Sequence, residues 1–171
     1  MLNQKKWVLT AAGLCTLSTG CPFTSCFVAG TRILTKTGFK PIETIRVGEL
    51  VWSMNTDTGQ RTLRPVSAIV IGSSAVTHRI EAGELSIPAV TSEHPFWSPS
   101  EQRWIAACEL QTGATLCAWL GAHDTTIMTV QHIQRTQHAA ETPVFTLSVD
   151  GPEHNYFAEG LLVHNKSIFV T

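Results

Sequence analysis

From residue 27 onward the chain consists of short extended segments, which turn signals interrupt about every eight to twelve residues. Residues 31–35 (TRILT) alternate polar and apolar side chains, and Lys36-Thr37-Gly38 follows as a tight turn. No stretch shows a convincing helical period, so we predict an all-β fold. The expected strands are 31–35, 47–53, 60–71, two strands within 77–90, 114–120, 125–135, 144–149, 156–158 and 161–164.

The segments between these strands are predicted to be turns and connections. Glu159-Gly160 has the composition of a hairpin turn. Residues 137–142 are interpreted as a linker that is long enough to accept an insertion. A chain of 171 residues is the length of one domain and long enough to bury a core. We therefore predict a single folded domain.

The charge distribution argues against nucleic-acid binding. Twelve basic and thirteen acidic residues give a formal net charge of −1, and no segment concentrates Lys or Arg. A nucleic-acid interface needs such a basic patch. After residue 25, no run approaches the roughly eighteen apolar residues of a membrane-spanning helix. We expect no nucleic-acid partner, and contact with a membrane only through a lipid anchor.

Residues 1–20 differ from the rest of the chain. Lys5-Lys6 precedes a short apolar run, and small residues follow before Cys21, which is the layout of a secretory signal peptide. The layout also resembles a bacterial lipoprotein signal, in which the Cys is lipidated. We therefore expect an exported protein (in the periplasm, on the cell surface or secreted), with Cys21 as the lipidation site and 21–25 as a short flank. The alternative is a buried N-terminal helix, which the missing amphipathic period disfavours.

The remaining cysteines leave two alternatives for their redox state. Cys108 and Cys117 lie on either side of a Gly-containing turn. They would form a disulfide in an oxidising compartment, and two buried thiols are equally compatible with the sequence. No CxxC pair and no His/Cys cluster has the spacing of a zinc site. We predict no metal and no cofactor.

The segment Leu161-Leu162-Val163-His164-Asn165-Lys166 can break its own backbone. An Asn side-chain amide can attack its own backbone carbonyl, close a succinimide ring and release the following residue. This reaction is very slow in an ordinary loop. A His directly before the Asn, on a buried apolar strand, fixes the geometry and supplies a proton to the leaving amine. On its own, a His-Asn pair is more often a surface strand end.

Cys26 begins the globular part of the sequence, directly after a turn-forming stretch. A thiol there is well placed to attack the carbonyl of Ser25. That N-to-S acyl shift converts an amide into a thioester, which is much easier to cleave. The alternative roles are a disulfide partner or an ordinary Cys at the start of a strand.

An acyl shift needs an acid for the leaving amine and hydrogen-bond donors for the carbonyl oxygen. Thr91 and His94 lie three residues apart on a turn that Pro95 stiffens, and they could supply both. A lone His beside aromatic residues is more often part of the core. His154 is a second candidate acid or base. The other histidines are predicted to be surface or hydrogen-bonding residues: His78, His123, His132 and His138.

Taken together, these segments resemble the Hint superfamily, which comprises inteins, bacterial intein-like domains and the hedgehog autoprocessing domain. The resemblance covers 26–165, which we take as the Hint domain, with 166–171 as a C-terminal flank. It implies a flattened, pseudo-twofold β horseshoe that brings the first and last residues together. The segments that carry the resemblance, in the family's order, are 26–31 with 41–43, 47–51, 91–95 (the TxxH motif), and 144–157 ending in 163–165.

The resemblance implies a role for each candidate residue. Cys26 is the nucleophile, while Thr91 and His94 activate the Ser25–Cys26 bond. His154 supports proton transfer. His164 assists Asn165, which cyclises and cleaves the Asn165–Lys166 bond.

Two departures from the family pattern argue against splicing. Full splicing needs a Cys, Ser or Thr directly after the terminal Asn, and this chain has Lys166 there. Family members also often carry an Asp where this chain has Thr146. We therefore expect independent cleavage at the two ends, without ligation.

The expected function is a single-turnover, self-cleaving domain that acts on its own backbone. Water or an external nucleophile would resolve the thioester. The alternative is a catalytically decayed Hint module that serves as a binding or scaffold domain. Lys166, Thr146 and the short flanks motivate that alternative.

Overall fold

The computed structural model describes residues 25–121 and 124–165, and these residues form an almost purely β structure. The predicted signal, Cys21 and Lys166 lie outside the described residues. The elements are β1 (Phe27–Val28), β2 (Arg32–Thr35), β3 (Gly38–Pro41), η1 (Ile42–Thr44), β4 (Leu50–Met54), β5 (Arg61–Ala82), β6 (Leu85–Val90), β7 (Pro95–Ser98), β8 (Arg103–Ala106), η2 (Ala107–Glu109), β9 (Thr115–Trp119), β10 (Thr125–Val149), β11 (Asn155–Ala158) and β12 (Leu161–His164).

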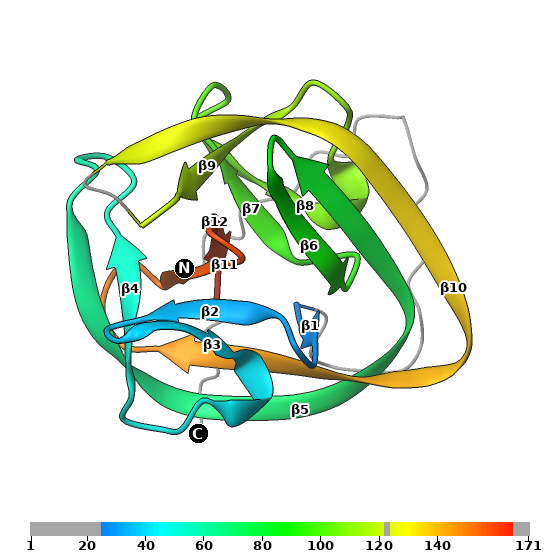
Figure 1. The fold of residues 1–171 in the computed structure, drawn as a ribbon, viewed down its shortest axis with the longest axis horizontal. Helices are drawn as coiled ribbons and strands as arrows, with labels where there is room; N and C mark the ends of the chain where they lie inside the picture. The colour runs from blue at the N-terminus through cyan, green and yellow to red at the C-terminus, as the bar shows by residue number, and fades with distance from the viewer. Residues whose placement is uncertain (1–24, 122–123, 166–171) are drawn as a thin grey trace, which may run out of the picture.

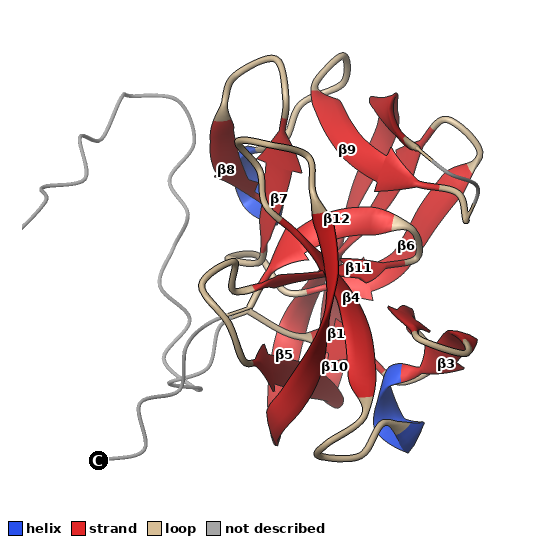
Figure 2. Ribbon diagram, turned by 90° about the vertical axis from the view of Figure 1, so that its left-hand side faces the viewer, coloured by secondary structure: helices blue, strands red, loops and turns tan. Residues whose placement is uncertain are grey.

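Every strand pairing in this structure is antiparallel, and twelve strands join into one continuous sheet across the described part of the chain. The only helical segments in that part are the 3-10 turns η1 and η2, drawn in blue in Figure 2. No helix of the described residues is long and apolar enough to cross a membrane. The all-β prediction is confirmed.

Two long strands, β5 and β10, make the frame of the molecule. Figure 1 shows them curving around the outside, with β11 and β12 in the middle of the ring. They pair from Val130 opposite Ala82 to Val149 opposite Val66. The other strands are two to six residues long and pair inside or beside this frame.

The prediction of a linker at 137–142 is wrong, because these residues lie within β10. The expected break between 71 and 77 is also absent, because β5 runs through it. Each strand supplies backbone hydrogen-bond partners for the other, which keeps polar and Gly-containing segments extended. The irregularity appears instead as a register jump, since Gln137 faces Val76 while Thr142 faces Ser74.

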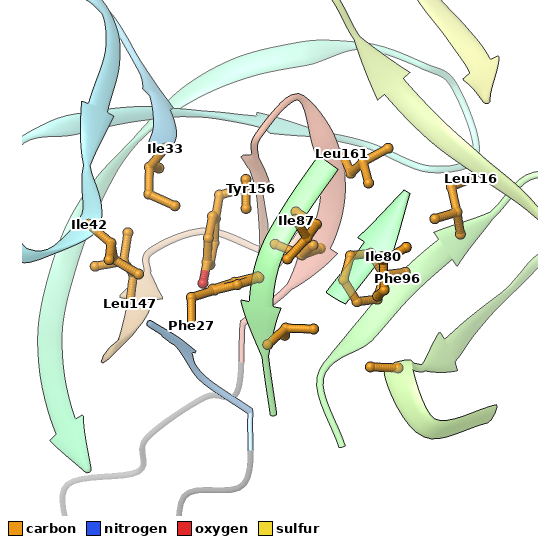
Figure 3. Packing of buried hydrophobic residues seen from close by; sticks show 14 of the residues in the cluster. Phe27, Ile33, Ile42, Ile80, Ile87, Phe96, Leu116, Leu147, Tyr156 and Leu161 are labelled. Atoms are coloured by element: carbon orange, nitrogen blue, oxygen red, sulfur yellow. The ribbon is translucent and has the colours of Figure 1, made fainter. Parts of the chain in front are cut away.

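The core lies between the arms of the frame. Its largest members include Phe27 from β1, Phe96 from β7 and Tyr156 from β11, and Figure 3 shows them packed together with aliphatic side chains from several other strands. A second cluster lies around Trp97, Trp119 and their neighbours. Because residues on successive positions of β11 and β12 contribute to different clusters, this hairpin is buried on both faces.

The first and last strands of the described chain are both interior strands. Phe27 of β1 pairs with Phe145 of β10 on one side and Val90 of β6 on the other. Strand β12 pairs with β11, β9 and β7. Since both chain ends enter the core as strands, the peptide groups at the two ends are held in fixed positions.

Candidate functional site

The N-terminal junction is buried and is held by Thr91. Ser25 and Cys26 are both buried. The Cys26 N–H donates to Thr91 Oγ1 at 2.8 Å, and the Thr91 N–H donates to the Cys26 carbonyl oxygen at 2.9 Å. The strands account for this pair, because Thr91 directly follows Val90, the β6 partner of Phe27. The nitrogen of the Ser25–Cys26 peptide bond is thus oriented by a side-chain hydroxyl.

His94 is placed against the same junction by a tight turn. The His94 N–H donates to the Thr91 carbonyl oxygen at 3.2 Å, and Ser25 Oγ donates to the Glu93 carbonyl oxygen at 3.4 Å. The imidazole is fully buried, with its centroid 4.2 Å from that of the Phe27 ring and 6.0 Å from that of Phe96. The predicted Thr91–His94 pair therefore does meet at Cys26.

Burial keeps the His94 ring neutral. Desolvation lowers its pKa from 6.5 to about 3, the Ser25 backbone acts in the opposite direction, and nearby His164 lowers it further. Within residues 25–121 and 124–165, neither ring nitrogen has a hydrogen-bond partner, so the Ser25 backbone lies close without completing a hydrogen bond. Both ring nitrogens remain available to a reacting group.

The C-terminal junction is buried as well. The Asn165 N–H donates to the His154 carbonyl oxygen at 2.8 Å, which continues the β11–β12 pairing past His164. The Asn165 side chain is fully buried, and neither its oxygen nor its nitrogen has a partner among the described residues. A buried amide without partners costs free energy, and here it leaves the nitrogen able to turn toward its own backbone carbonyl.

His164 lies between Trp104 and His154. Its ring centroid is 4.9 Å from the Trp104 ring in an edge-on contact and 6.4 Å from the His154 ring. Burial lowers its pKa, the Asn165 backbone opposes that effect, and His154 reinforces it. His154 itself has φ of +48°, a left-handed conformation that is uncommon for a non-glycine residue. The three C-terminal candidates are thus neighbours.

One strand connects the two junctions. Phe96 of β7 pairs with Val163 of β12 in an antiparallel register. His164, the residue after Val163, lies close enough to lower the pKa of His94, which directly precedes β7. The Thr91 turn at Cys26 and the last strand, β12, are therefore neighbours through β7.

Sequence reasoning missed two residues near Cys26. His78 was predicted only as a surface or hydrogen-bonding residue, but it is buried, and its Nε2 lies 3.1 Å from Ser92 Oγ, next to Thr91. Burial, and then Arg135, lower its pKa. Tyr156 is fully buried beside Phe27, with ring centroids 6.5 Å apart. Its position in an apolar strand gave no signal beyond core packing.

Among the other described histidines and cysteines, Cys108 lies next to the 91–94 turn, where its N–H donates to the Ser92 carbonyl oxygen at 2.9 Å. His138 Nε2 is 2.8 Å from Thr77 Oγ1, His132 is exposed, and His123 lies outside the described residues. Cys108 and Cys117 are thiols, and burial raises the pKa of the Cys117 thiol to about 11. Across the described ranges, no group of three His, Cys, Asp or Glu side chains is arranged to hold a metal ion.

A β horseshoe whose first and last described residues are both buried, the first against a TxxH turn, defines a domain of the Hint class, the class that includes inteins. The chain belongs to the pretoxin HINT domain family, whose model matches residues 32–171. A comparison with curated proteins returned no match.

Solved structures agree with this assignment. The bacterial intein-like domain from Clostridium thermocellum is 28% identical, with a TM-score of 0.74 over 82% of this chain and 98% of its own. The Ssp DnaB mini-intein variant M86 is 16% identical, with a TM-score of 0.74 over 87% and 98% of the two chains. A DnaB intein from Synechocystis sp. PCC 6803 is 18% identical, with a TM-score of 0.73 over 84% and 99%. The predicted Hint fold is confirmed.

Proposed function

We propose that this domain cleaves its own backbone at two places, before Cys26 and after Asn165, and does not join the ends. The observation that carries the proposal is the placement of His94, which follows the Thr91 turn that holds Cys26 and directly precedes β7, the partner strand of β12. Buried reactive groups held close to a histidine have the proximity and the acid–base partner that cleavage of their own backbone needs.

In the N-terminal step, the Cys26 sulfur attacks the Ser25 carbonyl carbon. A C–S bond forms, the C–N bond of the Ser25–Cys26 peptide breaks, and the thiol proton ends on the Cys26 nitrogen. Thr91 Oγ1 orients that nitrogen by accepting a hydrogen bond from its N–H. The neutral His94 imidazole can take up the thiol proton at one nitrogen and stabilise the developing oxyanion by donating from the other. Water or an external amine then resolves the thioester.

In the C-terminal step, Asn165 Nδ2 attacks the Asn165 backbone carbonyl carbon. The new C–N bond closes the succinimide, the peptide bond to Lys166 breaks, and a proton moves from Nδ2 to the Lys166 nitrogen. The unpartnered side-chain amide supports this step, because no hydrogen bond to a described residue must break before it rotates. His164 and its neighbour His154 are the proton carriers that we assign.

Ligation is not part of the proposal, because the residue after Asn165 is Lys166. An ammonium is mostly protonated at neutral pH, since an unperturbed Lys has a pKa of about 10.4. Attack by its amine on the thioester would give a stable amide rather than an exchangeable ester. We further propose that the reaction takes place after export, as the composition of residues 1–20 suggests.

Intact mass spectrometry of the purified chain tests the proposal. The wild type should lose residues 166–171 during incubation, and an added small thiol should release the segment before Cys26. Asn165→Ala should abolish only the first loss and Cys26→Ala only the second, because each variant removes the attacking atom of one step. An unchanged full-length mass after long incubation, with and without thiol, would overturn the proposal.

A decayed Hint module that acts as a binding scaffold is the second candidate. Two observations favour it: Lys166 replaces a splicing nucleophile, and the low pKa of His94 leaves almost none of it protonated at neutral pH. Trapping of the thioester with an added thiol nucleophile, followed by intact mass spectrometry, separates the two candidate functions. A Cys26 that never yields a thioester adduct, in a chain with an intact Asn165–Lys166 bond, would support the scaffold.

A further inference from the structure

Tyr156 is a buried polar group beside Cys26 that the proposed steps do not use. Its ring packs edge-on against Phe27, the residue after Cys26, and Figure 3 shows its hydroxyl oxygen directed toward Phe27 of β1. Its hydroxyl has no hydrogen-bond partner of standard geometry among the described residues. Leaving a buried phenol in this state costs free energy, which phenylalanine at the same place would avoid.

Thr146 brings a second hydroxyl to the same point. Phe27 pairs with Phe145 across β1 and β10, so the register one residue earlier places Cys26 opposite Thr146. Side chains of opposed residues project to the same face, with their Cβ atoms about 5 Å apart. Thr146 is buried, and its hydroxyl also lacks a partner of standard geometry within the described ranges.

The electrostatics agree with this geometry. Burial raises the pKa of Tyr156 above its ordinary value, Cys26 raises it further, and the Thr146 hydroxyl and the Leu147 backbone act in the opposite direction. The phenol therefore stays protonated, and able to donate, throughout the range in which a thiol ionises. Two titratable side chains of the described residues lie at this junction: Tyr156 from β11, which Cys26 affects electrostatically, and His94 from the turn before β7.

We propose that the Tyr156 hydroxyl donates a hydrogen bond to the Cys26 sulfur, while the Thr146 hydroxyl donates to the phenol oxygen. Two hydroxyls in series polarise one another, so the outer group strengthens the inner bond. The bond to sulfur favours the thiolate and fixes its direction toward the Ser25 carbonyl. Tyr156 is then a positioning residue for the nucleophile, an inference that rests on the proposed role of Cys26.

The test compares Tyr156→Phe with the wild type by NMR titration of chains that carry 13Cβ-labelled cysteine, with the Cys26 signal assigned from a Cys26→Ser spectrum. The midpoint of the Cys26 titration should rise by about one pH unit in the variant. Thiol-dependent release at neutral pH should slow about tenfold, because the thiolate fraction falls by that factor. Loss of 166–171 should keep its wild-type rate.

Two threonine variants complete the comparison. Thr146→Val should shift the Cys26 midpoint in the same direction by a smaller amount, and it carries the test by itself if Tyr156→Phe does not fold. Thr31→Val is the matched control, because it removes another buried hydroxyl without a partner in the described part of the chain, and it should leave the midpoint unchanged.

An unchanged midpoint in Tyr156→Phe, or in Thr146→Val where the first variant does not fold, overturns the assignment. The titration does not depend on cleavage. If the chain never cleaves, the proposed function is refuted, but the titration still tests the role of Tyr156. If the wild type cleaves normally and Tyr156→Phe leaves the Cys26 midpoint unchanged, the proposed function stands and the role of Tyr156 is refuted.

Discussion

At the scale of single residues, buried polar atoms without partners collect at the two junctions. Over the described residues, His94, Thr146, Tyr156 and Asn165 each carry such atoms. Folded proteins usually pair nearly all buried polar groups, because an unpaired one is costly. Their place at the two predicted cleavage points agrees with the proposed function, in which these groups take part in a reaction, whereas Thr31 carries a similar atom elsewhere.

Acid should destabilise the fold through His94. Its folded-state pKa of about 3 lies below the unfolded value of 6.5, so the unfolded chain binds the proton more readily and stability falls as pH drops from 6.5 toward 3. Between pH 7 and pH 4 the wild type should lose about 3 kcal/mol more unfolding free energy than His94→Gln. Chemical denaturation at both pH values measures the difference.

The matched control is His132→Gln, because His132 is exposed on β10. This variant should lose as much stability in acid as the wild type. Equal losses in the wild type and His94→Gln would show that His94 is not held neutral by burial.

Reactive residues could be predicted from the sequence where the reaction needs a particular functional group. Cys26 and Asn165 carry a thiol and a carboxamide, which are able to make these two attacks, and their neighbours in sequence support them. Tyr156 could not be found in this way, because an aromatic residue in a short apolar strand indicates core packing. The pairing of β1 with β10 brings Thr146 toward Cys26, and the packing of Tyr156 against Phe27 brings the phenol there.

At the scale of elements, Asn155 fixes the β11–β12 hairpin to β4. Its Oδ1 accepts from Ser53 Oγ and from the Met54 N–H, both at 2.9 Å, and its Nδ2 donates to the Met54 carbonyl oxygen at 2.8 Å. Asn155 also faces His164 in the hairpin register. The position of His164 therefore depends on the hydrogen bonds that the Asn155 side chain makes to β4.

Asn155→Ala should lower the free energy of unfolding by about 2–4 kcal/mol, because it leaves the buried Met54 groups and Ser53 without partners. It should also slow the loss of 166–171, while thiol-dependent release before Cys26 changes less. Denaturant titration and intact mass give the two values. Asn55→Ala is the control, because Asn55 Oδ1 makes its two backbone hydrogen bonds in an exposed turn. A control that destabilises as much as Asn155→Ala would contradict this account.

The lengths of β5 and β10 could not be predicted from the sequence, because they depend on pairing between distant segments. Residues 72–76 and 137–142 have the composition of connections, and single-sequence patterns assign them accordingly. Each is extended because the other strand runs beside it. Pairing between residues this far apart is a property of the whole sheet, whereas the short strands follow from their own alternation and turns.

At the scale of the whole molecule, the frame of β5 and β10 converts two distant points in the sequence into one site. Cys26 and Asn165 lie directly before β1 and directly after β12, and the β6–β7 turn carries Thr91 and His94. In the proposed function, each attacking group acts on a carbonyl of its own or the preceding residue. The proposed steps therefore depend on high effective concentration rather than on encounter.

Cleavage should accordingly be first order in protein. Over a roughly hundredfold dilution, the rate constants for loss of 166–171 and for thiol-dependent release at fixed thiol should stay the same, because no second chain takes part. Mixing provides the stricter test. Isotope-labelled Asn165→Ala should keep its C-terminal segment in the presence of excess unlabelled wild type, since the nucleophile for that bond is its own missing amide. A rate that falls with dilution, or labelled chain that shortens in the mixture, would mean that one copy acts on another.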